Sequence, residues 1–171
     1  VGTGSMGEET RYLFSSIEQK TLNLTFRVDY SLTPNLSLQF YGSPFVTAGS
    51  YGEFKRVTDP QAENYADRYH PFAQDEIRYD EDSGEYLVDE DADGTDDYAI
   101  SNPDFNYRDF NSNFVLRWEF QPGSLLYLVW SQSRSSFVSD GTFAASGDLG
   151  ELFDVPPHNI FLLKVSKWLS L

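Results

Sequence analysis

The sequence predicts an all-β fold, specifically an antiparallel, up-and-down transmembrane β-barrel segment that supplies about five to six strands of a larger barrel. Five segments of about ten residues alternate apolar and polar side chains, and the connections between them are in turn short and long. Both patterns are typical of outer-membrane barrels. No stretch approaches the roughly 20 consecutive apolar residues that a membrane-spanning helix requires.

The clearest segment is residues 21–32, in which every even-numbered position is apolar and every odd-numbered position is polar. Side chains on a β-strand point alternately to opposite faces, so this strand has one apolar and one polar face. The apolar positions are Leu22, Leu24, Phe26, Val28, Tyr30 and Leu32.

Two tight turns punctuate the other strands. Thr-Pro-Asn at 33–35 and Gln-Pro-Gly at 121–123 have the residues that favour such turns. Residues 11–14 are consistent with the end of an earlier strand. The further predicted strands are 36–41, 111–120, 125–135 and 160–171.

The lengths of the connections predict the orientation of the wall. Outer-membrane barrels have short periplasmic turns and longer extracellular loops. Both proline-containing turns are therefore expected in the periplasm, and the long acidic loop at about 52–107 is expected outside the cell, as is the connection before residue 160. The last strand then descends, so the C-terminus is predicted to be periplasmic and the protein to lie in the cell outer membrane.

Five strands cannot close a bacterial barrel, because such walls have at least eight strands. Residues 1–171 are therefore predicted to be the C-terminal part of a barrel domain. An unpaired strand edge in hydrocarbon leaves backbone groups unsatisfied at several kcal/mol each, so upstream strands or partner chains are expected to complete the wall. The alternative is a soluble β-sandwich with the same alternation.

Composition narrows the classes of partner. The net charge of -15 argues against a nucleic-acid partner, because phosphate binding is driven by Lys and Arg. The absence of Cys excludes disulfides, thiol catalysis and a zinc site built from Cys. Lipid of the outer membrane and surface glycans are the expected contacts.

The long loop contains a possible cation site in its acidic run. Between Asp75 and Asp97 twelve carboxylates and one arginine contribute -11 of the net charge of -15. Residues 89–97 match the opening of an EF-type calcium loop, with side-chain oxygens at positions 1, 3, 5 and 9 and glycine at position 6. The predicted Ca²⁺ ligands are Asp89, Asp91, Asp93, Thr95 through its backbone carbonyl, and Asp97.

Position 12 of this loop is Ile100, where EF-type loops carry a bidentate Glu. Calcium affinity is therefore expected to be low, and the alternative is that the run is only a solvated, disordered face. Just before it, residues 76–79 and 85–88 predict a small extracellular hairpin.

Other polar and aromatic residues suggest a barrel wall rather than an active site. His70 and His158 each adjoin proline and belong to no recognisable catalytic set, so no enzymatic activity is predicted. Four charged residues share the polar parity of two strands and are expected to face the lumen and pair with one another: Arg27, Asp29, Arg117 and Glu119. Five aromatic residues are expected near strand ends, as an interfacial belt: Trp118, Phe120, Tyr127, Trp130 and Trp168.

Several stretches together resemble the C-terminal end of an uncharacterised family of Gram-negative outer-membrane β-barrel proteins, in which a carbohydrate-binding family 9-like domain precedes the barrel. The stretches are 12–14, 33–39, 101–108 (Ser-Asn-Pro-Asp-Phe-Asn-Tyr-Arg), 115–124 (Val-Leu-Arg-Trp-Glu-Phe-Gln-Pro-Gly-Ser) and 126–132. The resemblance covers nearly the whole chain and implies several hundred further residues upstream. It implies no activity, because the sugar-binding description belongs to the upstream domain.

Two functional hypotheses follow from the sequence. The first is a non-enzymatic outer-membrane barrel segment with a calcium-binding extracellular loop, associated with surface glycans or with transport. The alternative is a soluble, secreted all-β carbohydrate-binding module, which would use Trp and Tyr for sugar and the acidic loop for calcium.

Overall fold

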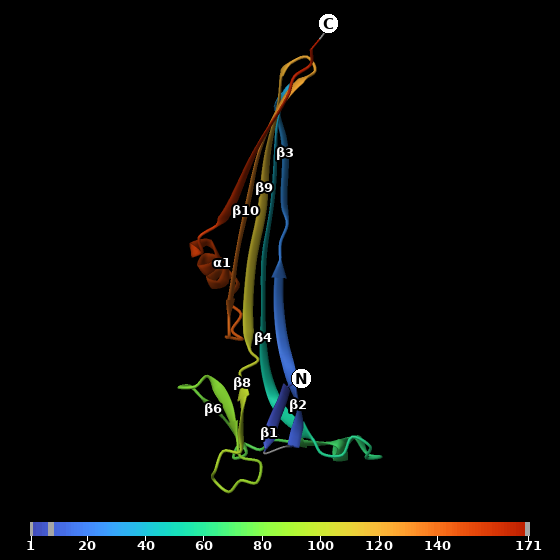
Figure 1. Ribbon diagram of the computed structural model, residues 1–171, viewed down its shortest axis with the longest axis vertical. Helices are drawn as coiled ribbons and strands as arrows, with labels where there is room; N and C mark the ends of the chain where they lie inside the picture. Colours follow the sequence, from blue (N-terminus) through green and yellow to red (C-terminus); the bar gives the residue numbers. More distant parts are fainter. Residues whose placement is uncertain (1, 7–8, 170–171) are drawn as a thin grey trace. The chain divides into compact units, whose positions relative to one another are not determined.

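The computed structural model describes residues 2–6 and 9–169 of the chain (Figure 1). In that part the chain forms strands, one α-helix and one 3-10 helix. In chain order these are β1 (Gly2–Met6), β2 (Glu9–Asn23), β3 (Phe26–Thr33), β4 (Leu36–Val57), η1 (Tyr65–Arg68), β5 (Tyr69–Pro71), β6 (Ile77–Asp80), β7 (Glu85–Val88), β8 (Tyr98–Ser101), β9 (Phe105–Gln121), β10 (Ser124–Val138), α1 (Ala145–Asp154) and β11 (His158–Ser166).

The strands form two antiparallel sheets. The larger sheet has eight strands in the order β1-β2-β4-β9-β10-β11, with β3 and β5 also paired to β4, and the smaller has the order β6-β7-β8. The predicted all-β, antiparallel class is confirmed. Within the described residues the larger sheet is open, since β1 and β11 stand at opposite ends of its order. Closure into a barrel stays a prediction.

The first predicted strand is interrupted rather than continuous. β2 ends at Asn23 and β3 begins at Phe26, and both pair with β4. The break lies opposite Pro44, which has no N–H to donate to a neighbouring strand. Instead, the Leu24 amide donates to the Pro44 carbonyl at 3.1 Å. The alternation of residues 21–32 therefore does not indicate the interruption, because its cause lies on the partner strand.

Both predicted tight turns are confirmed. Pro34 and Asn35 join β3 to β4, and Pro122 and Gly123 join β9 to β10. Gly123 has φ +74°, a conformation that glycine adopts at little cost. Its amide donates to Glu119 Oε1 at 2.9 Å, so the turn is held by a side chain of the preceding strand.

Two strands extend further than predicted, which shortens the long loop. β4 continues to Val57 and β9 begins at Phe105, so the connection is 58–104 rather than about 52–107. Residues 42–52 contain glycine and proline, which resemble loop residues in the sequence. Gly49 is nevertheless in β4, and a Cβ there would lie 2.5 Å from the Phe105 ring, so glycine allows this ring to pack on the strand.

The chain divides into two compact units. Unit 1 comprises Val1–Gln19, Gly49–Phe105 and Ser139–Gly141. It contains the β6-β7-β8 sheet, in which the predicted hairpin is confirmed and β8 adds a third strand. Leu13, Val88 and Tyr98 are the buried centre of its core, and Phe72, Ile77 and Ile100 pack against them.

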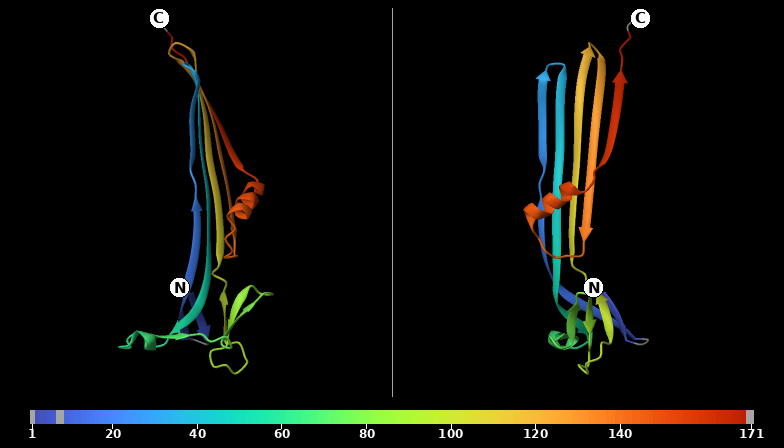
Figure 2. Two further views of the ribbon diagram at one scale, coloured as in Figure 1. Left: turned by 180° about the vertical axis from the view of Figure 1, so that it is seen from behind. Right: turned by 90° about the vertical axis from the view of Figure 1, so that its left-hand side faces the viewer.

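Unit 2 comprises Lys20–Ala48, Asn106–Val138 and Thr142–Leu171. Here β3, β4, β9, β10 and β11 lie side by side, and α1 crosses one face of them (Figure 2). The helix falls in a predicted loop and was not expected. β11 ends at Ser166, so residues 167–169 lie outside the strand predicted to reach 171, and 170–171 lie outside the described residues.

Candidate functional site

One face of the sheet in unit 2 is apolar across all of its strands. The register pairs Val28 with Phe40 and Leu128 with both Leu116 and Leu163. Gly42 lies on the same side of β4 as Phe40. A Cβ placed on Gly42 would lie 3.6 Å from the Phe110 ring of β9, so Phe40 and Phe110 are on the same face of the sheet. We call it the apolar face; its residues are Phe26, Val28, Tyr30, Leu38, Phe40, Phe110, Phe114, Leu116, Trp118, Leu126, Leu128, Trp130, Phe161, Leu163 and Val165.

Many of these side chains are exposed. Phe26 is 54% exposed, Phe161 69% and Leu163 65%. Among the described residues of unit 2, the buried hydrophobic side chains are Val46, Ala48 and Leu152. Val46 and Ala48 have the parity of Phe40 farther along β4, and Leu152 is in α1, so none is one of the fifteen residues named above. Soluble proteins rarely leave a contiguous apolar surface of this kind uncovered.

The opposite face of the sheet is more polar. Arg27, Asp29, Gln39, Tyr41 and Asn113 line a hollow of about 290 Å³ there, together with two apolar neighbours. The Arg27 guanidinium lies over the Tyr41 ring, 5.8 Å from its centroid. Towards β11 this face also carries aliphatic residues, so its polarity is strongest on β3, β4 and β9.

The four predicted lumen charges pair only in part. Arg117 and Glu119 form an ion pair at 3.9 Å within β9. Arg27 and Asp29 line the same hollow, and no contact links them to the other pair among the interactions of the described residues. The two groups thus lie on the same face without forming one network.

The predicted aromatic belt divides between the two faces. Trp118 and Trp130 lie on the apolar face, and the Phe120 ring is 6.0 Å from that of Trp118. Tyr127 pairs with Arg117 and Lys164 and so lies on the opposite face. Trp130 was predicted near a strand end, but β10 continues eight residues beyond it to Val138. Trp168 follows β11 and is 71% exposed.

The acidic run forms an ordered loop between β7 and β8. Asp89 is buried at the end of β7, and its two carboxylate oxygens accept the amides of Asp93 at 3.1 Å and Gly94 at 2.8 Å. Asp97 accepts the Glu90 amide at 2.8 Å. Ala92 and Gly94 have positive φ values, which permit the sharp turn between these two ends.

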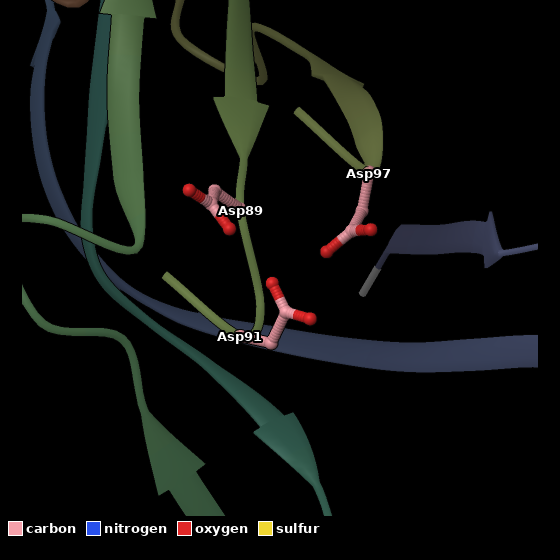
Figure 3. A group of neighbouring side chains, drawn as sticks. All are labelled: Asp89, Asp91 and Asp97. Carbon is pink, nitrogen blue, oxygen red and sulfur yellow. The ribbon is translucent and has the colours of Figure 1, made fainter. Parts of the chain in front are cut away.

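Three of the five predicted calcium ligands come together in this loop. Oxygen atoms of Asp89, Asp91 and Asp97, which Figure 3 shows as neighbouring side chains, all lie within 4.8 Å of one another. Asp93 is not in this group, and its Oδ1 accepts the Thr95 amide at 2.8 Å. Thr95 is exposed beyond it.

The spacing of these oxygens suits a hard cation. Ca²⁺ binds oxygen at about 2.3–2.6 Å, so two ligands on opposite sides of the ion are roughly 4.8 Å apart. The charge of Asp93, followed by partial desolvation, raises the pKa of Asp91 above its ordinary value of 3.8. Carboxylates that repel one another in this way are the groups that a bound cation stabilises.

Glu90 in the same loop has a structural role that sequence reasoning missed. Its side chain is 7% exposed and lies 3.5 Å from Arg11 Nε and 3.3 Å from an Arg56 guanidinium nitrogen. It also accepts the Tyr98 hydroxyl at 2.8 Å, and burial together with this bond raises the pKa of Tyr98 well above its ordinary value. These contacts fix the loop to β2, β4 and β8, and nothing in the acidic run distinguishes Glu90 from its neighbours.

The two histidines lie apart from each other. His70 Nε2 lies 2.8 Å and 2.9 Å from the two carboxylate oxygens of Glu76. Burial alone would raise the pKa of Glu76, but the Ala73 amide and the bond and charge of His70 outweigh it and hold that pKa below its ordinary value. His158 lines a separate hollow in unit 2, with Asp109 and Ser133 among its neighbours.

No helix among the described residues has both the length and the apolar character needed to cross a membrane. Searches of curated proteins and of solved structures found no match to this chain. One family model matches it, over residues 3–170, with the description "Domain of unknown function (DUF5916)". Since the match covers nearly the whole sequence, the chain belongs to the DUF5916 family.

Proposed function

We propose that this chain forms part of the wall of an outer-membrane β-barrel, with its apolar face towards lipid and its acidic loop outside the cell. The observation that carries the proposal is the exposed apolar face of unit 2. Its cross-strand neighbours are apolar from β3 to β11, and residues such as Phe161 and Leu163 are more than half exposed. Lipid acyl chains cover such a face without the cost that water imposes, about 25 cal/mol per Å² of apolar surface.

Strand lengths agree with a membrane crossing. A tilted transmembrane strand needs about 9–11 residues. β9 has 17 residues and β10 has 15, so both are long enough to cross and to extend beyond the hydrocarbon. The alternation of faces along both strands is that of a wall with lipid on one side and a polar interior on the other.

The connections support the proposed orientation. Two-residue turns join β3 to β4 and β9 to β10, and long segments join β4 to β9 and β10 to β11. Short turns are typical of the periplasmic end and long segments of the extracellular end. Unit 1, which holds the long segment, is then extracellular and the end of β11 is periplasmic.

The open sheet requires further strands. Among the described residues β3 pairs only with β4 and β11 only with β10. An unpaired edge in hydrocarbon would leave backbone donors and acceptors unsatisfied, so upstream strands of the full-length protein or partner chains complete the wall. The resemblance to outer-membrane barrel proteins with a carbohydrate-binding family 9-like domain supports this reading and suggests surface glycans as partners. Transport through the lumen is the second candidate function of such a wall. Neither glycan association nor transport involves catalysis.

We also propose that the acidic loop binds Ca²⁺. The grouping of Asp89, Asp91 and Asp97 supports it. Asp93 and Thr95 complete the predicted set after a local rearrangement of the loop. Because Ile100 replaces the bidentate Glu of EF-type loops, the expected dissociation constant is in the weak range of extracellular modules, about 10⁻⁴–10⁻³ M.

The first test is the membrane partition of the native full-length protein, followed by gel electrophoresis with and without heating. Extraction only in detergent, with mobility that changes on heating, supports the barrel. Recovery in buffer without detergent contradicts it and favours a soluble carbohydrate-binding module, whose apolar face would then be covered by another protein surface.

A further inference from the structure

The helix α1 lies on the same side of the sheet as the apolar face. The rings of Phe110 and Phe153 are 5.0 Å apart. Asn106 and Arg108, which share the parity of Phe110 on β9, both donate to Asp148 of the helix. The register between β9 and β10 is uninterrupted from Asn106 to Glu119, so this parity is also that of Phe114, Leu116 and Trp118.

The rows of paired residues on this face change in character towards the helix. Four successive rows can be followed from the centre of the apolar face: Leu116, Leu128 and Leu163; then Phe114, Trp130 and Phe161; then Ser112, Gln132 and Asn159; then Phe110 and Arg134. The first three rows are aliphatic, aromatic, and polar amide or hydroxyl, and the fourth combines an aromatic ring with a cation. From the acyl chains towards the headgroups of a membrane, aliphatic side chains are likewise followed by aromatic and then by polar or charged ones.

The side-chain hydrogen bonds of Trp130 and Arg134 lie in the polar rows and at the helix rather than in the aliphatic row. The indole N–H of Trp130 donates to Asn159 Oδ1 in the next row, at 2.8 Å. Arg134 donates to Gln132 Oε1 at 2.9 Å and to the Phe153 carbonyl at 2.6 Å. Trp130 thus presents its polar atom away from the aliphatic row, which is the arrangement of an interfacial tryptophan.

The helix is fixed at this level by a buried ion pair. Arg108 is 6% and Asp148 3% exposed, and their closest atoms are 2.9 Å apart. Glu151 also bonds to Arg108, so one guanidinium contacts two of the helix carboxylates and the group of three keeps one negative charge. Asp154, the last residue of α1, is exposed.

Phe153 is the large hydrophobic side chain of α1 that is exposed. It is 50% exposed, and the Arg134 guanidinium lies over its ring, 5.1 Å from the centroid. Aromatic and arginine side chains together suit the zone where acyl chains meet anionic headgroups, since the ring is apolar and the cation complements phosphate.

We propose that α1 is an interfacial helix, held on the outside of the barrel wall, whose Phe153 contacts the outer leaflet where the headgroups meet the acyl chains. Arg134 lies beside Phe153 at the headgroup level. This inference rests on the proposed function, because the apolar face must be the lipid-facing one. Residues 145–154 lie in a predicted loop, so neither the helix nor its contact with lipid was expected from the sequence.

The test measures membrane depth with a nitroxide spin label. Residues 1–171 contain no Cys. A single Cys introduced there is therefore the only labelled position, provided that any cysteine elsewhere in the full-length protein is replaced by Ser. Labels are attached to Phe153→Cys, to Leu163→Cys in the apolar face and to Glu81→Cys in the β6–β7 turn. The ratio of collision with oxygen to collision with a water-soluble nickel chelate is recorded in lipid vesicles, because oxygen concentrates in acyl chains.

The expected ratio is highest for Leu163→Cys, lowest for Glu81→Cys and intermediate for Phe153→Cys. If the Phe153→Cys ratio equals that of Glu81→Cys while that of Leu163→Cys is high, the interfacial helix is overturned and the proposed barrel stands. If it equals that of Leu163→Cys, the headgroup level is overturned. If Leu163→Cys itself gives the ratio of Glu81→Cys, the lipid-facing assignment and the inference built on it both fail.

A second labelled position guards against loss of folding at Phe153. Leu149→Cys is one helical turn earlier on the same side of α1, so the same intermediate ratio is expected there. Heat-modifiable mobility of each labelled variant verifies that the barrel has formed before the ratios are compared.

Discussion

Trp130 of β10 stacks on Phe161 of β11, with ring centroids 5.9 Å apart and ring planes 6° from parallel. The two residues are direct partners in the antiparallel register. Phe114 of β9 pairs with Trp130 from the other side, so an aromatic row crosses three strands. This row separates the aliphatic part of the apolar face from the polar row of Ser112, Gln132 and Asn159.

Leu162 and Leu163 provide a matched test of the two faces. They are neighbours on β11, point to opposite faces and are 53% and 65% exposed. We expect Leu163→Arg to lower the free energy of unfolding by about 2–4 kcal/mol, because it buries a charge in lipid. Leu162→Arg is expected to cost about 1 kcal/mol or less. Urea titration of the barrel in vesicles measures both, and equal small effects would contradict the lipid-facing assignment.

Asp91 allows a test of the cation loop. We expect Asp91→Asn to weaken Ca²⁺ binding by roughly tenfold, because removing one ligand charge costs on the order of 1.4 kcal/mol. Asp82→Asn, in the exposed β6–β7 turn, is the control and is expected to bind as the parent does. Isothermal titration of the full-length protein measures both, and an unchanged affinity in Asp91→Asn would remove this residue from the site.

Ca²⁺ affinity is also expected to depend on pH. The pKa of Asp91 is raised above 3.8, chiefly by the charge of Asp93. A raised carboxyl pKa means that protonation relieves repulsion in the empty loop, so protons compete with Ca²⁺ at a higher pH than for an isolated Asp. Calcium titrations at falling pH should show the affinity beginning to decline above pH 3.8. A constant affinity through that range would contradict the site.

The Arg108–Asp148 pair is expected to hold α1 on the sheet. Arg108→Met leaves Asp148 buried without its cation, and breaking a buried pair in this way costs about 3–5 kcal/mol. Because the helix is short and contains two glycines, we expect residues 145–154 to lose hydrogen-exchange protection. Glu151→Gln, at a side chain 67% exposed, is the control and should cost about 1 kcal/mol or less. Retained protection in Arg108→Met would assign the anchor to other contacts.

Glu76 makes the stability of unit 1 dependent on pH. Its pKa is held below 4.5 despite burial, so its contribution is present above pH 4.5 and is lost as the pH falls through the lowered pKa. We expect Glu76→Gln to cost about 1–2 kcal/mol at neutral pH, through the weakened bonds to His70 and Ala73. The difference from the parent should shrink in acid. Hydrogen exchange of β6 and β7 across pH measures it, and a constant difference would exclude the carboxylate as the cause.

Local sequence patterns predicted the elements whose cause is local. The turns at 33–35 and 121–123 contain proline with asparagine or glycine, and the hairpin of β6 and β7 has alternating residues around a polar turn. The interruption at Leu24 was missed because it depends on Pro44 in another strand. β4 was predicted too short because glycines such as Gly49 serve packing there rather than a turn.

The candidate cation site was predicted only in part, because its spacing is local whereas the convergence of its side chains depends on strand pairing. The spacing of aspartates identified the loop, because the EF-type pattern is a property of consecutive residues. Which carboxylates converge was decided by the pairing of β7 with β8, which brings Asp97 back beside Asp89 while Asp93 turns to the Thr95 amide. Glu90 was indistinguishable from its neighbours until Arg11, Arg56 and Tyr98 surrounded it.

The sequence by itself determined the all-β class, the two-faced strands and the tight turns, since alternation and turn chemistry act over a few residues. Only the tertiary structure decided which residues of β10 share the apolar face, because both faces of that strand are apolar in the sequence and the choice depends on the register with β9 and β11. It alone revealed α1 as well. A ten-residue helix of low intrinsic propensity forms there because Arg108 and Phe110, far away in the sequence, bind Asp148 and Phe153.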